Sequence, residues 1–177
     1  MAMSSFPIPW AEALEGCKLS VENAKRLAED ARLLRDNDKL ASAFSVSLSA
    51  WEELGKAVLL FRYWKQKQDI SLRDWLGVIC NHRRKQAAIV ESMDILYASV
   101  PPKTIAQLKD NLEKNWKEWG EWFDLQRELG VYVDWVGTWR SPTRIEKTAF
   151  KFPFSSSYWI ESVRALSVHV KRILPDS

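Results

Sequence analysis

The sequence predicts an all-α protein, an up-and-down bundle of about five helices with one long ordered loop before the last helix. Apolar residues recur at helical spacing through most of the chain. Turn-forming residues separate the periodic segments, and glycine and proline are few, at 6 and 7 residues. The 177 residues contain neither an internal repeat nor a linker, so a single domain over residues 1–177 is expected.

Two long helices are predicted in the first part of the chain. The first begins after Pro9 and ends near Arg35, and the second runs from about Lys39 to Lys67 with Asp38 as its expected N-cap. The residues at helical spacing that form one stripe along the first helix are Leu19, Asn23, Leu27, Ala31 and Leu34. The stripe of the second is Val46, Ala50, Leu54, Val58 and Phe61.

Three further helices are predicted after residue 70. The third opens at "SLRD", residues 71–74, which resembles a capping box, and ends near Ser99. The fourth covers about residues 104–129 and stops at Gly130, and the last starts near Ser157. Residues 131–156 mix β-branched and aromatic residues with Gly137, Pro142 and Pro153, which favours an ordered loop that has room for a short hairpin.

Composition excludes several classes of protein. The start "MAMSSFPIPW" lacks the pattern of a secretory signal, and no apolar stretch reaches the roughly 18 residues of a membrane span, so a cytoplasmic protein without membrane contact is expected. Neither cysteine has a CxxC neighbour, and both fit reduced small hydrophobes. The chain lacks a Walker loop and paired Glu-x-x-His motifs, so no metal and no cofactor are expected.

A cluster of charged residues interrupts the apolar second helix, in "SAWEELGKAVLLFRYW". We expect Glu52 to pair with Lys56 on a solvated face and Glu53 to point inward. Gly55 costs about 1 kcal/mol in mid-helix relative to alanine, which suggests that another backbone approaches there. The segment "NHRRKQ" offers His82 and Lys85 on one face. The expected polar cluster is therefore Glu53, Lys56, His82 and Lys85, which could fix the packing register or perform chemistry.

Four segments occur in an order that resembles the AbiV-type abortive-infection family of bacteria: "ENAKRLAEDARLL", "SLSAWEELGKAVLL", "NHRRK" and "RELGVYVDWVGTWRSP". They span about residues 20–145. The resemblance implies a helical bundle of the HEPN kind and a role in phage defence. It also implies that a member able to cleave RNA would do so as a homodimer, through an Arg-x4–6-His motif in a late helix.

The last helix contains one match to that motif, Arg164 and His169. Histidine can exchange a proton with a ribose hydroxyl or a leaving oxygen, and arginine can stabilise charge on phosphoryl oxygens. The product would be a 2′,3′-cyclic phosphate, formed without a metal. Five residues turn an ideal helix by about 140°, so the arginine would have to reach toward the histidine. The alternative pairs Arg164 with Glu161 and leaves His169 as an exposed surface residue.

Two other segments are candidate binding sites. His82 could serve a different site as a base, with Arg83 and Arg84 on phosphate; the alternative is that these basic residues form a solvated face. The loop residues Tyr132, Asp134, Trp139 and Arg140 form the second candidate, because long loops in compact domains tend to carry function.

Two functions from different classes follow from these candidates. The first is a phage-defence protein that acts on RNA or the translation apparatus, as an endoribonuclease or an inhibitor of translation. The second is a non-enzymatic module that recognises a phage or host protein. Nucleotide or small-ligand binding in the bundle without turnover is a third alternative.

Overall fold

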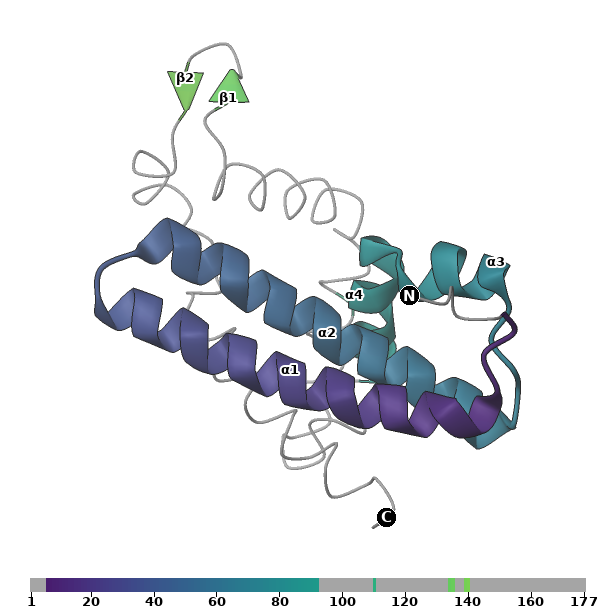
Figure 1. Cartoon of the computed structure of the whole chain (residues 1–177). Coiled ribbons are helices and arrows are strands. Elements are labelled where there is room, and N and C mark those ends of the chain that lie inside the picture. The colour runs from purple at the N-terminus through teal and green to yellow at the C-terminus, as the bar shows by residue number, and fades with distance from the viewer. Residues whose placement is uncertain (1–5, 93–109, 111–133, 136–138, 141–177) are drawn as a thin grey trace.

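The computed structural model describes residues 6–92, 110, 134–135 and 139–140 (Figure 1). Two long helices dominate this part of the chain, α1 (Trp10–Asp36) and α2 (Leu40–Gln66). They lie side by side and antiparallel along their length (Figure 1). Their bounds agree with the predicted ones to within about one residue, and the all-α class is confirmed for the described residues.

The turn between α1 and α2 differs from the prediction in its details. Asp38 does not cap α2; its backbone has a positive φ of 57°. Its amide instead donates to Arg35 O at 3.0 Å, and the Lys39 amide donates to Leu34 O at 2.9 Å. Aspartate tolerates this left-handed conformation better than most residues, which explains why it occupies the turn.

The buried face of α1 consists of small residues. These are Ala13, Cys17, Ser20, Val21, Ala24, Ala28 and Ala31. Of the predicted stripe, Ala31 is buried and Leu27 packs against the core while partly buried, whereas Leu19 is 56% exposed and was wrongly placed. Small side chains allow two helices to approach closely, so alanine rather than leucine marks the contact face here. Burial raises the pKa of the Cys17 thiol to about 12, so this residue behaves as a small hydrophobic side chain. The other cysteine, Cys80, is exposed.

The buried face of α2 is wider than that of α1, because α2 packs against both α1 and α4. Ala50, Leu54 and Val58 of the predicted stripe are buried, while Val46 and Phe61 are half-buried. Most of the described core therefore surrounds α2.

The predicted third helix is divided. Ser71 caps its start, as expected, by accepting from the Asp74 amide at 3.1 Å. The chain then forms α3 (Leu72–Asp74), a π-helical turn η1 (Trp75–Ile79), and a separate helix α4 (His82–Glu91). The break falls at Asn81, whose extended backbone and side-chain oxygen cap α4 by accepting from the Arg84 amide at 3.1 Å. The prediction of a single helix from Ser71 onward was therefore wrong.

The end of the α1–α2 pair away from the turn is joined by backbone and side-chain hydrogen bonds. Ile8 and Ile70 form an antiparallel bridge, with N–O distances of 2.9 and 2.8 Å. The Trp10 amide donates to the Asp69 carboxylate at 2.8 Å, which satisfies an amide at the first turn of α1.

A short hairpin is confirmed by strands β1 (Asp134–Trp135) and β2 (Trp139–Arg140), which pair antiparallel. Asp134 is the ladder partner of Arg140. The predicted last helix lies outside the described residues, as does the predicted fourth helix apart from Asp110, which is helical. No helix in the described part of the chain is both long and apolar enough to cross a membrane.

Candidate functional site

The contact between α2 and α4 depends on Gly55. A Cβ atom built on this residue would lie only 2.1 Å from the backbone oxygen of Lys85. The prediction that another backbone approaches Gly55 is therefore confirmed, and that backbone is the first turn of α4. The absence of a side chain at position 55 lets α4 lie directly on α2.

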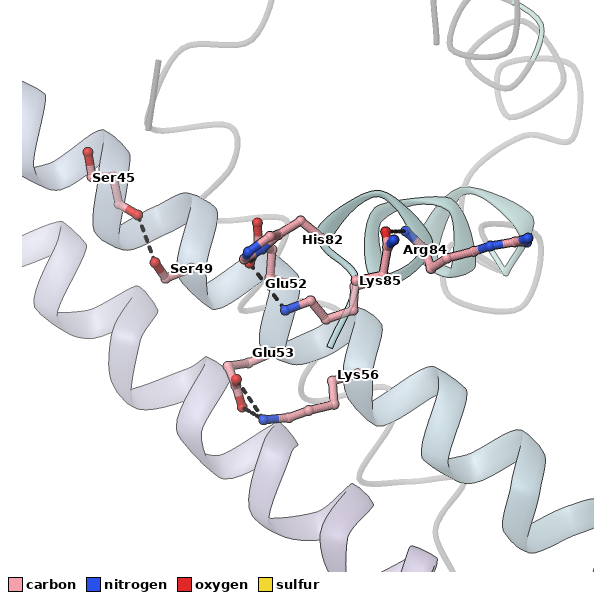
Figure 2. Close-up of polar contacts among 9 residues, drawn as sticks. Ser45, Ser49, Glu52, Glu53, Lys56, His82, Arg84 and Lys85 are labelled. Carbon is pink, nitrogen blue, oxygen red and sulfur yellow. Dashed lines mark hydrogen bonds and ion pairs between the residues drawn. The ribbon is translucent and has the colours of Figure 1, made fainter. Parts of the chain in front are cut away.

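A buried carboxylate, that of Glu52, lies beside this contact (Figure 2). Its residue is 6% exposed, and its Oε2 accepts from Lys85 Nζ at 3.3 Å and lies 2.5 Å from His82 Nδ1. All three side chains meet between α2 and α4 (Figure 2). This group, Glu52, His82 and Lys85, is called the α2–α4 cluster below.

The prediction that Glu53 makes these contacts was wrong. Glu53 pairs with Lys56 at 2.7 Å, with side-chain exposures of 19 and 25%. Lys56 lines a groove together with residues of α1, on the other side of α2. Residue 52 is one turn from Gly55 on the same face of the helix, whereas residue 53 is rotated about 160° away from Gly55. The expected cluster of four residues is therefore two separate groups, and the expected Glu52–Lys56 pair is replaced by these contacts.

The α2–α4 cluster divides its two basic members between the interior and the surface. Lys85 is buried, and its ammonium offsets the charge of the Glu52 carboxylate, as burial of a charge requires. The side chain of His82 is 44% exposed. The cluster therefore presents an imidazole to solvent while its carboxylate stays inside.

Two arginines accompany His82 on the first turn of α4. Arg83 and Arg84 follow it in sequence, and both are exposed. The Asn81 cap fixes where this turn begins. The first turn of α4 therefore presents an imidazole and two guanidinium groups to solvent, while Lys85 of the same turn is buried against Glu52.

The other end of α4 is held to α2 by Arg62. Its guanidinium donates to the Glu91 carboxylate at 2.8 Å, to the Ser92 hydroxyl at 3.0 Å and to the Ala88 carbonyl at 3.4 Å. Together with the contact at Gly55, these bonds fix α4 on α2 at both of its ends.

The remaining candidate residues differ in what the structure describes. Tyr132, Arg164 and His169 lie outside the described residues. Asp134 and Arg140 are described as ladder partners in the hairpin. Glu52 is the residue that the sequence prediction missed, and its position one turn before Gly55 is the signal that could have identified it.

A groove of about 290 Å³ lies elsewhere, along α1 near its N-terminal end. Its mostly apolar lining includes Ile8, Ala13, Gly16, Leu19, Leu60 and Trp75. It contains neither His82 nor the exposed arginines, so it is separate from the α2–α4 cluster.

The fold and the cluster define an all-α domain whose α2 and α4 are joined by a buried ionic contact with an imidazole at its edge. The chain belongs to the AbiV family: the pattern of HEPN_AbiV, described as AbiV, matches residues 12–154. This confirms the resemblance, and membership implies a role in abortive infection, a form of phage defence. The matched range includes the α2–α4 cluster and ends before Arg164 and His169. No curated protein and no solved structure matches the chain.

Proposed function

We propose that this AbiV-family protein defends bacteria against phage by acting on RNA in the cytoplasm, as a metal-independent, homodimeric endoribonuclease. Inhibition of translation would follow from cleavage of RNA that translation needs. The observation that carries the proposal is the exposed first turn of α4, where His82 is followed by Arg83 and Arg84. Guanidinium groups match phosphate in charge and geometry, and an imidazole can transfer protons at neutral pH.

The rigidity of this turn supports the proposal. Charged side chains on a loosely held helix pay conformational entropy when they bind a ligand. Here the buried Lys85–Glu52 contact and the backbone contact at Gly55 fix the turn before any ligand arrives. A phosphate chain would therefore meet a preorganised basic surface.

Cleavage is the first expected result. Purified protein, incubated with single-stranded RNA and excess EDTA, should release fragments that end in 2′,3′-cyclic phosphate and begin with a 5′-hydroxyl. Mass spectrometry of the products distinguishes these ends from those that simple hydrolysis leaves. His169→Ala should abolish cleavage if the Arg164–His169 motif acts as the family resemblance implies. Robust cleavage by His169→Ala would remove that residue from the site. A wild-type protein that leaves RNA intact would refute the proposed function.

Binding through Arg83 and Arg84 gives a second expected result. The double variant Arg83→Ala/Arg84→Ala should bind RNA about tenfold more weakly. Its plot of log affinity against log salt concentration should be shallower by about 1.4, because each phosphate contact on a single strand contributes about 0.7. Fluorescence anisotropy at several salt concentrations measures both quantities. Arg26→Ala is the matched control, because this exposed arginine pairs with Asp30 on α1 and should leave affinity and slope unchanged.

A second function, recognition of a phage or host protein without catalysis, has its own supporting observation. Leu72 and Leu76 are exposed on the α3–η1 segment, and Leu19 is exposed on the groove that Trp75 also lines. Large exposed apolar surfaces are typical of protein contacts. If this function is the correct one, Leu72→Ser/Leu76→Ser should abolish protection against phage while RNA remains intact in wild-type cells.

A further inference from the structure

We infer that Glu52 and His82 form a general-base dyad, in which His82 takes the proton of a ribose 2′-hydroxyl next to a phosphodiester and Glu52 positions the imidazole. The inference rests on the proposed function, because it names the group that would start RNA cleavage. It places the base that takes the 2′-hydroxyl proton on α4, within the range matched by the family. The Arg164–His169 motif is tested separately by His169→Ala.

The geometry of the contact fixes which nitrogen of His82 can act. Glu52 Oε2 lies 2.5 Å from Nδ1, so in the neutral ring Nδ1 carries the hydrogen and donates it to the carboxylate. The lone pair that can accept a proton is then on Nε2. With 44% of the His82 side chain exposed, a substrate can reach the ring, while the acceptor oxygen stays inside the protein.

The surroundings of Glu52 suit it to orienting an imidazole. Its residue is 6% exposed, so the hydrogen bond to Nδ1 lies in a medium of low dielectric, where it is stronger than in water. Lys85 Nζ donates to the same oxygen at 3.3 Å. A carboxylate held in this way fixes the tautomer and the ring plane of its histidine, and it stabilises the imidazolium that forms during reaction.

The step balances without a metal or a co-reactant other than water. His82 Nε2 takes the 2′-hydroxyl proton as the 2′-oxygen forms a bond to phosphorus. The bond between phosphorus and the 5′-oxygen of the next nucleotide breaks, and that oxygen receives a proton from solvent. The imidazolium returns its proton to solvent. The products are a 2′,3′-cyclic phosphate and a 5′-hydroxyl, and Arg83 or Arg84 can hold a phosphoryl oxygen as charge develops on it.

Two variants of His82 test its role as the base. His82→Asn keeps an amide donor for Glu52 but has no base, so it should retain the wild-type melting temperature while its kcat on RNA falls about 100-fold or more. His82→Ala should lose a similar amount and regain cleavage when free imidazole is added, because the site is open to solvent. A structural role for His82 would not be rescued in this way.

Variants of the two neighbouring glutamates test whether Glu52 positions the imidazole of His82. Glu52→Gln should lower kcat about tenfold or more with little change in KM for RNA, because the substrate does not touch Glu52. Glu53→Gln is the matched control, since Glu53 contacts Lys56 and not His82, and its kcat should equal that of the wild type. Equal kcat for Glu52→Gln and Glu53→Gln would overturn the positioning role.

The outcomes separate the dyad from the proposed function. Wild-type rates of RNA cleavage by His82→Asn would overturn the dyad and leave the endoribonuclease proposal standing. A wild-type protein that does not cleave RNA overturns both. A substrate with a single 2′-deoxy sugar at the cleaved position should remain intact, and its cleavage would also contradict the dyad.

Discussion

Gly55→Ala should lower the free energy of unfolding by about 3 kcal/mol, at the upper end of what overpacking of a core usually costs. The added methyl group would meet the Lys85 carbonyl oxygen at 2.1 Å, and this neighbour is backbone, which cannot rotate away as a flexible side chain can. Helix α4 would have to move off α2. In a chain of 177 residues the expected fall in melting temperature is about 6–12 °C, which differential scanning calorimetry measures.

Gly77→Ala is the matched control for this variant. A Cβ atom on Gly77 would meet nothing within 4 Å, so the substitution adds a methyl group without a clash. Because alanine favours helix over glycine, the melting temperature should stay constant or rise slightly. Equal losses for Gly55→Ala and Gly77→Ala would contradict the close contact between α2 and α4.

Glu52→Ala should destabilise the protein by about 3–5 kcal/mol, because removing one partner of a buried ion pair leaves the other charge uncompensated. The charge left behind is the buried ammonium of Lys85. Glu53→Ala removes a carboxylate from a more exposed pair with Lys56 and should cost about 0–1 kcal/mol. Urea denaturation of both variants measures the difference.

A double variant tests the cause of that loss. Glu52→Met/Lys85→Met removes both charges and should recover much of the stability that Glu52→Ala loses, since apolar residues of similar volume often replace a buried ion pair without cost. If the double variant is no more stable than Glu52→Ala, the loss comes from packing and not from an uncompensated charge.

The sequence predicted the long helices well because their signals are local. Pro9, the turn at residues 36–39 and the end near Lys67 are read from neighbouring residues, and the structure agrees closely at each. The role of Gly55 was also predicted correctly, because glycine weakens a helix and its presence in a strongly helical run indicates that a side chain would clash there.

The predictions that failed depended on which way a helix faces. Glu52 and Glu53 are adjacent and identical in type, so only the direction of α4 decides which one is buried. The face of α1 was misjudged for a related reason: a leucine stripe and an alanine stripe both have helical spacing, and close packing against α2 selected alanine. The break before α4 was not predicted, because the Asn81 side chain can cap a helix only where its own backbone is extended.

The divided helix also leaves the protein with a convenient chemical handle. Of the two cysteines in the sequence, Cys17 is buried with a raised thiol pKa, and Cys80 is exposed two positions before His82. Thiolate is the reactive form of cysteine, so a maleimide dye added to the folded protein would attach at position 80 and leave position 17 unlabelled. The native chain can therefore carry a single fluorophore beside the α2–α4 cluster, and the proposed binding of RNA could be tested in real time without engineering a new attachment point.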